Sequence, residues 1–251
     1  MASGDTTTGQ LSDSLNTIVA SARTTRDFGG VVPQLVDKTT LDPNSGTSWK
    51  EILFAQLAAQ AITETTRNDN PQAYVDSAIT ITPQMVQIST FITDKSQRNV
   101  SRKALALMGK MPGEALVMKE DEDGLTAMDA STQMGATGTP IQAGDIASAR
   151  YIITSNATEP GPMPIAGVFH GFVIKDMYDE LVAGVGTYPI PEGATAQVFK
   201  TGFTLPIASV SIVEDGNIAI DSTPDAKGFV FSKLAWVLVR GMAIKTEPQR
   251  K

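Results

Sequence analysis

The sequence predicts an α+β fold, in which helices and strands follow one another without the regular strand–helix–strand alternation of a doubly wound sheet. Two observations carry this prediction. Between residues 100 and 125, apolar side chains recur in steps of three, four or seven, which is the spacing of one face of a long helix. On both sides of that stretch, short apolar runs lie between turns rich in glycine, proline and asparagine, as is typical of strands.

Length and composition describe a chain that folds around a core. It has 251 residues, 41% hydrophobic and 19% charged, enough for one large domain or two small ones. The absence of cysteine excludes disulfides and thiolate metal sites, and it fits an intracellular folding environment. Every hydrophobic run is interrupted well short of about 18 residues, and the first residues lack the basic and apolar regions of a secretory signal. We therefore expect no membrane span.

Charge is distributed unevenly along the predicted central helix. A basic segment runs from Lys95 to Lys110, and the chain turns acidic from Glu120 to Asp123. The net charge of −7 disfavours a protein that binds nucleic acid by releasing counterions, and the basic segment is the one candidate for such a patch. At helical spacing we interpret it as a solvated or interfacial flank instead.

The N-terminal residues are predicted to form an arm. Residues 1–10 are rich in threonine, glycine and serine and should be extended. Residues 11–22 read as a short amphipathic helix, with Leu15 and Ile18 on its apolar face.

A β-hairpin arm is expected next. Residues 31–36 read as an edge strand in spite of Pro33. Residues 48–57 and 73–82 then flank a polar stretch at 63–71. A strand, a long polar excursion and a second strand describe a hairpin that does not close over a core of its own.

The central helix follows a second alternating segment. Residues 79–92 alternate as a strand that Pro83 interrupts. The helix should begin near Asp94 or Ser96, because both residue types suit the N-cap position. Pro112 lacks an amide hydrogen and crowds the preceding turn, so we expect a kink or short break there, not a domain boundary.

The C-terminal half is predicted to mix short helices and strands after a Gly/Thr-rich linker at 131–140. Asp176 is expected to cap the second of two helices. The predicted elements are helices at 145–154 and 176–183, strands at 164–174 and 209–213, a turn at 215–217, and one or two buried elements within 229–244.

Signals of catalysis, cofactor binding and metal binding are nearly absent. His170 is the only histidine and lies in an apolar run, where a hydrogen-bonded strand residue is the more common role. The Gly184-Val-Gly186 stretch starts like a dinucleotide fingerprint, but Pro189 replaces the third glycine. The acidic run at 120–123 lacks the spacing of a calcium loop, and we interpret it as a solvated or partner-facing helix face. We predict no catalytic, cofactor or metal site.

The run from Ser77 to Ser131 resembles the centre of the major capsid proteins of tailed bacteriophages with the HK97 fold, most closely the short marine-phage type. In that family a strand pair ends in an ITP turn and leads to a TD helix start and a long spine helix. The matching residues of the spine are Gly109, Gly113, Ala115, Leu116, Lys119 and Asp121 or Asp123.

Later segments keep the family's order. Residues 141–153 resemble the first helix of the axial domain, and FVIKDMYDEL, IASVSIVEDGNI and GFVFSKLAWVLV resemble the elements that follow, with Lys233 and Ala235 in the matching places. Two departures stand out. Lys175-Asp176 replaces the family's HP pair, and the chain stops at TEPQRK, where relatives usually continue into final strands.

The resemblance implies a wedge-shaped subunit whose neighbours pack along both sides of the spine helix. Its implied parts are an N-terminal arm (1–30), an extended loop with flanking peripheral-domain strands (31–93), the spine helix of the peripheral domain (94–132), an axial domain (133–240) and a return towards the peripheral domain (241–251). Residues expected at subunit interfaces are Leu15, Ile18, Arg98, Arg102, Lys103, Lys110, Pro112, Glu120, Asp121 and Asp123.

The implied function is that of a major capsid protein without enzymatic activity or cofactor. Copies would form pentamers and hexamers of an icosahedral shell, with scaffold, portal or decoration proteins as further partners and only weak, non-specific contact with the packaged double-stranded DNA. The implied location is the virion, assembled in the host cytoplasm. Two alternatives stay open: an encapsulin-type nanocompartment on the same fold, and an acidic α+β ligand-binding domain or enzyme.

Overall fold

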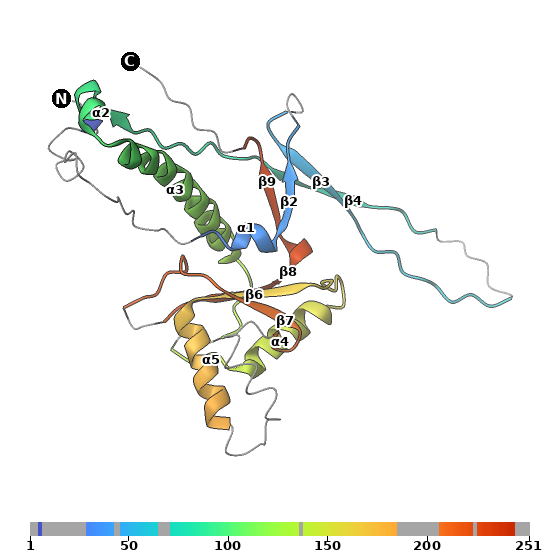
Figure 1. Cartoon of the computed structure of the whole chain (residues 1–251). Coiled ribbons are helices and arrows are strands. Elements are labelled where there is room, and N and C mark those ends of the chain that lie inside the picture. Colours follow the sequence, from blue (N-terminus) through green and yellow to red (C-terminus); the bar gives the residue numbers. More distant parts are fainter. Residues whose placement is uncertain are drawn as a thin grey trace.

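The computed structural model places a long central helix above a small sheet, and a hairpin projects to one side (Figure 1). Helix α3 (Arg102–Met128) packs against helix α1 (Val32–Leu35), and helices α4 and α5 lie below the sheet. This mixture of helices and separate small sheets confirms the predicted α+β class. The structure describes residues 5–6, 29–42, 46–64, 71–135, 138–184, 206–222 and 225–243.

The central helical region consists of two helices. Helix α2 (Asp94–Asn99) begins after Thr93, whose side chain accepts the Ser96 N–H. The backbone becomes extended at Val100, and Ser101 caps α3 by accepting the Ala104 N–H. The prediction of one helix starting at residue 94 or 96 is therefore wrong, because a second capping residue starts the long helix eight residues later than Asp94.

Helix α3 passes through Pro112 without interruption. The helix is continuous at Pro112, so the short break that the sequence allowed is absent. The kink and the absence of a domain boundary there stay predictions. The predicted apolar stripe is buried within the chain mainly near the C-terminal end of α3, where Leu125 and Met128 pack against α1. Met111, in the same stripe, is 46% exposed, because the described elements cover only part of the helix.

Residues 32–35 form helix α1, which contradicts the predicted edge strand at 31–36. Pro33 lies in the first turn of α1, where its fixed φ suits a helix and its missing N–H is not needed. Strand β2 (Asp37–Thr40) follows and pairs in parallel with β9 (Val237–Arg240). The sequence assigned residues 237–240 to the axial domain, whereas β9 pairs with a strand that it assigned to the peripheral domain.

The hairpin forms where the sequence predicts it. Strands β3 (Trp49–Phe54) and β4 (Asp76–Ile81) pair antiparallel, with Trp49 opposite Ile81 and Phe54 opposite Asp76. Figure 1 shows the hairpin extending well beyond the other elements. Separately, β5 (Phe91–Ile92), which precedes α2, pairs in parallel with β1 (Asp5–Thr6).

The lower part of the molecule is a three-stranded sheet covered by two helices. Central strand β6 (Ile165–Phe169) is parallel to β7 (Val210–Glu214) and antiparallel to β8 (Gly228–Ser232). Helix α4 (Ala143–Thr154) and helix α5 (Gly171–Gly184) pack on one face. A short 3₁₀ helix, η2 (Lys233–Ala235), links β8 to β9.

Helix α5 begins earlier than the sequence predicts. The predicted strand at 164–174 ends at Phe169, and Asp176 lies inside α5 instead of capping it. The His170 Nδ1 accepts the Phe172 N–H at 3.1 Å, so this histidine supports the first turn of the helix. A histidine in a capping position is a weak sequence signal, which explains the wrong boundary.

Two buried clusters meet at β6, because alternate residues of a strand face opposite sides. Ala166 and Val168 face the upper cluster, which joins the sheet to α1 and α3; Ile165 and Phe169 face the lower cluster with α4 and α5. The upper cluster comprises Val32, Val36, Leu125, Met128, Ala166, Val168, Ile218 and Phe231, and the lower one Ile146, Ile165, Phe169, Val173, Met177, Val210 and Ile212.

Two glycines of α3 should respond oppositely to substitution by alanine. At Gly113 an added Cβ meets no atom within 4 Å, so Gly113→Ala should raise the free energy of unfolding by about 0.5–1 kcal/mol. At Gly124 the Cβ would lie 2.8 Å from Val32 Cγ1 on α1, so Gly124→Ala should lower it. Urea unfolding of the unassembled full-length chain measures both, and effects of the same sign would contradict the packing of α1 against α3.

Candidate functional site

The acidic run on α3 forms contacts inside the subunit. Glu120 accepts two hydrogen bonds from Arg240 of β9, from Nε at 2.6 Å and from Nη2 at 2.7 Å. Such bidentate pairs are among the strongest contacts between an arginine and a carboxylate. The hydrogen bond with Glu120 raises the pKa of Arg240. Glu120 therefore has its partner in its own chain and ties β9 to α3.

Asp121 is fully buried and accepts three hydrogen bonds. Its Oδ1 accepts the backbone N–H groups of Val31 and Val32, both at 2.8 Å, and its Oδ2 accepts Asn217 Nδ2 at 2.7 Å. The two backbone donors lie at the start of α1, where the peptide dipoles favour a negative charge. The prediction that Asp121 lies on an outward flank is wrong, because these donors draw the carboxylate inside.

Asp215 is a second buried carboxyl group in the same cluster. It lies in the turn after β7, and its Oδ1 accepts the Asn217 N–H at 2.9 Å. Burial raises the pKa of Asp215 to about 6, and the neighbouring Asp121 adds to the rise while the Asn217 N–H opposes it. The sequence predicted only a turn here, since an Asp-Gly-Asn stretch normally indicates no more than that.

The remaining charges at this end of α3 lie at the surface. Asp123 pairs with Lys119 at 2.7 Å, one helical turn away, and both side chains are about half exposed. Asp129, just after α3, pairs with Lys227, which precedes β8. Of the acidic residues predicted at an interface, Asp123 alone points outward without a tie to another element.

The basic flank differs from the acidic run. Arg98, Arg102 and Lys110 are exposed, and none forms an ion pair with any residue that the structure describes. Pro112 is half-buried. The side chain of Lys103 and the predicted arm residues Leu15 and Ile18 lie outside the described residues.

The hairpin carries a large exposed apolar surface that the interface prediction did not name. Phe54 is 68% exposed and Ile52 is 59% exposed, although such side chains normally lie in a core. The order of strand, polar stretch and strand predicted the hairpin but gave no sign that both faces would stay open. The exposed apolar residues of the hairpin and its tip are Ile52, Leu53, Phe54, Leu57, Ile62, Tyr74, Val75 and Ile79.

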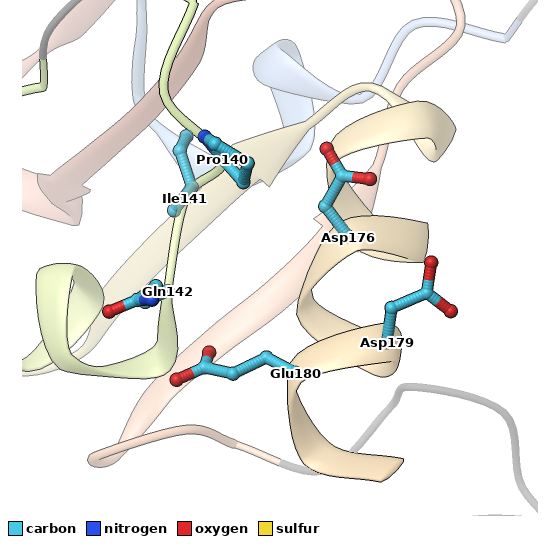
Figure 2. Close-up of a pocket in the computed structure, with 6 residues that line it drawn as sticks. All are labelled: Pro140, Ile141, Gln142, Asp176, Asp179 and Glu180. Carbon is cyan, nitrogen blue, oxygen red and sulfur yellow. The ribbon is translucent and has the colours of Figure 1, made fainter. Parts of the chain in front are cut away.

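An open acidic depression of about 490 Å³ lies between the start of α4 and one side of α5 (Figure 2). Pro140, Ile141 and Gln142 form one wall, and Asp176, Asp179 and Glu180 the other. Figure 2 shows Glu180 reaching towards the first turn of α4, where it accepts the Ala143 N–H at 2.8 Å. Asp179 pairs with Lys175 at 2.6 Å, so part of the negative charge is already balanced.

The described part of the chain holds neither a clustered metal site nor a helix suited to span a bilayer. No group of three or more histidine, aspartate or glutamate side chains there is placed to hold a metal ion. His170 is engaged at the start of α5. Among the described helices, none is both long and apolar enough to cross a bilayer.

Asp121 and Asp123 provide a matched pair of substitutions. Asp121→Ala should lower the free energy of unfolding by about 3 kcal/mol or more, because three donors in or near the core lose their acceptor. Asp123→Ala should leave it close to wild type, because that pair is exposed to solvent. Urea unfolding of the unassembled chain distinguishes them, and two similar small losses would contradict the buried contacts of Asp121.

Three solved structures share the fold over most of the chain. The capsid structure of the cyanophage P-SCSP1u has a TM-score of 0.65 at 16% identity, covering 94% of this chain and 83% of that chain. A structure from Mycobacterium phage Che8 has a TM-score of 0.64 at 15% identity, covering 89% and 82%. The mature capsid of bacteriophage PhiM1 has a TM-score of 0.60 at 12% identity, covering 90% and 79%.

The likeness concerns three-dimensional structure. No model of a known protein family matches the chain, and no curated protein matches its sequence. The agreement with several capsid structures over more than four fifths of the chain confirms the predicted fold class. The chain has the HK97-like fold of bacteriophage capsid proteins.

Proposed function

We propose that this chain is the major capsid protein of a tailed bacteriophage, which assembles as pentamers and hexamers into an icosahedral shell around a double-stranded DNA genome. The observation that carries the proposal is the exposed apolar hairpin on a molecule with a capsid fold. A fold alone does not specify a function, but this surface requires a partner.

Exposing the apolar side chains of the hairpin to water is energetically unfavourable for a single copy of the chain. Two strands without a packed face are at best marginally stable in water, and the hairpin leaves Phe54 at the end of β3 and Tyr74 just before β4 largely exposed. Covering them with a second copy of the chain removes apolar surface from water in every subunit at once. Closed symmetry then repeats the contact without leaving an unsatisfied end.

The basic flank of α2 and α3 is a second proposed contact. Arg98, Arg102 and Lys110 have no acidic partner among the described residues, so a neighbour's acidic surface would complement them and set register more than raw affinity. The proposed interface also includes the N-terminal arm. Its residues are Leu15, Ile18, Arg98, Arg102, Lys103, Lys110, Pro112 and Asp123.

The proposed parts of the subunit follow the sequence analysis with one change at the C-terminal end. The peripheral domain comprises the extended loop with its flanking strands and the spine helix, and the axial domain comprises the sheet β7-β6-β8 with α4 and α5. Strand β9 is assigned to the peripheral domain, because it pairs with β2 and Arg240 binds Glu120 of the spine.

Further partners and location follow from the same role. Scaffold, portal and decoration proteins are proposed to join the shell, which is assembled in the host cytoplasm and persists in the virion. The net charge of −7 keeps contact with the packaged DNA weak and non-specific. The role needs neither catalysis nor a cofactor.

Electron microscopy of the purified full-length chain tests the proposal against its alternatives. Closed shells that package DNA support the capsid role. Closed shells that enclose protein cargo indicate an encapsulin-type compartment, and a lasting 26.6 kDa monomer in every salt and pH indicates a ligand-binding domain or enzyme. The acidic depression beside α5 would then be the first place to look for a ligand.

Removing the apolar hairpin surface should abolish assembly without unfolding the subunit. In Ile52→Ser/Phe54→Ser, two largely exposed side chains on the same face of β3 are lost, so circular dichroism and urea unfolding should stay near wild type while shells disappear. Lys50→Ser, on the same face of the same strand, is the control and should assemble. Normal shells from the double variant would exclude the hairpin as a contact.

Reversing the basic flank should impair assembly more than folding. We expect the triple change Arg98→Glu/Arg102→Glu/Lys103→Glu to reduce shell yield strongly, because the penalty repeats at every subunit contact. Arg102→Glu alone should be tolerated, since one exposed ion pair contributes at most about 1 kcal/mol. Sedimentation measures shell yield, and unchanged yield from the triple variant would mean that this flank faces solvent.

A further inference from the structure

Two buried carboxyl groups approach one another where α3, the start of α1 and the turn after β7 meet. Asp121 comes from α3 and Asp215 from the turn, and both are almost completely buried. The neighbouring Asp121 adds to the rise in the pKa of Asp215. The side chain of Asn217 donates to Asp121, and its backbone N–H donates to Asp215.

The supply of hydrogen-bond donors to the two groups is unequal. Asp121 receives three N–H donors, spread over both oxygens. Asp215 receives one, on Oδ1, and its Oδ2 is buried without a partner among the described residues. Hydrogen-bond donors stabilise an ionised carboxylate. The surroundings of Asp121 therefore favour a negative charge more than the surroundings of Asp215 do.

A proton on Asp215 Oδ2 resolves this imbalance. It turns the unpartnered oxygen into a donor and supplies a hydrogen bond to Asp121, whereas two ionised carboxylates in the same buried place repel one another. The bond that forms joins the turn after β7 directly to the spine helix. Loss of the proton leaves two negatively charged carboxylates, those of Asp215 and Asp121, next to one another in a buried place.

We propose that Asp215 Oδ2 holds a proton that it donates to Asp121, and that this proton acts as a switch that tightens the junction between the spine helix and the turn after β7. Protonation closes the Asp215–Asp121 hydrogen bond, and deprotonation opens it. The upper buried cluster is adjacent, since its member Val32 donates its own N–H to Asp121 and its member Ile218 follows Asn217 in sequence. The switch therefore acts where α1, the spine and the sheet are held together.

The other charges on the packed elements are already paired or lie to the side. On α3, Glu120 is held by Arg240 of β9, Glu122 is partly exposed, and Asp129 beyond the helix end is held by Lys227. Glu214 precedes Asp215 and is exposed. The start of α1 offers only backbone N–H groups, so Asp121 is the charge that acts on Asp215.

The direction of the pH dependence follows from the pKa of Asp215. Burial and the Asp121 charge raise this pKa to about 6 in the folded chain, from an ordinary value of 3.8. The folded state therefore binds more protons than the unfolded state between these values. The contribution to stability is complete below the ordinary value and is lost as the pH rises through about 6. Acid tightens the junction, and neutral pH loosens it.

Infrared difference spectroscopy of the full-length chain detects the proton directly. Between pH 5.5 and 7, wild type should lose the carbonyl band of one protonated carboxyl group per chain, because ordinary carboxyl groups are already ionised there. Asp215→Asn should lack this change. Asp121→Asn should shift it to lower pH, because the neighbouring charge is removed. His170→Gln, which removes the only histidine, should retain it.

Urea unfolding at pH 5.5 and 7.5 tests the mechanical consequence. Wild type should unfold at a lower urea concentration at pH 7.5 than at pH 5.5, and His170→Gln should behave in the same way. Asp215→Asn should lose most of this difference and exceed wild type at pH 7.5, because its amide donates to Asp121 at every pH.

Three results would overturn the proposal. The first is a wild-type spectrum without a titrating carboxyl band near pH 6, a result that needs no variant to fold. The second is an unchanged band or an unchanged pH dependence of unfolding in Asp215→Asn. The third is stabilisation of wild type, but not of Asp215→Asn, by calcium ions at pH 7.5, which would assign the unpartnered Asp215 Oδ2 to a cation.

Discussion

The carboxylate of Asp121 is the contact on which the upper half of the subunit depends. It binds backbone N–H groups at residues 31 and 32 and the side chain of Asn217, so three segments that are remote in sequence meet on one side chain. Helix α1 has only four residues and is too short to be stable alone. Its position determines where β2 begins, and β2 holds β9. Without this carboxylate, the strands beside the spine would have no fixed start.

Patterns within single elements were enough to predict most of the fold. The helical spacing of apolar residues indicated α3, and the strand–polar–strand order indicated the β3–β4 hairpin. The wrong assignments concern segments whose sequence is compatible with more than one kind of secondary structure. Pro33 suits an edge strand and a first helical turn equally well, and packing of Val32 and Val36 against α3 selects the helix. His170 likewise starts α5 through a contact that no apolar pattern reveals.

The candidate surfaces were harder to predict than the fold, for a physical reason. Glu120, Asp121 and Asp123 look alike in sequence, yet they bind a strand, bind a helix start and face solvent, respectively. Which of these a carboxylate does depends on partners nearly a hundred or more residues away. The basic residues Arg98 and Arg102 were correctly expected on the surface, because long positive side chains remain solvated unless a specific partner removes them from water.

None of the hairpin residues that the structure describes belongs to either buried cluster, and this separation affects how the sequence varies over evolution. Substitutions on β3 and β4 leave the folding equilibrium of the single chain almost untouched, so in the proposed shell selection on them concerns only which copies associate. Strand β6 differs, because its side chains are packed into the two buried clusters and tolerate little change without loss of stability. Related lineages should therefore diverge fastest along the hairpin, and such drift would isolate their assemblies from one another while the subunit architecture stays the same.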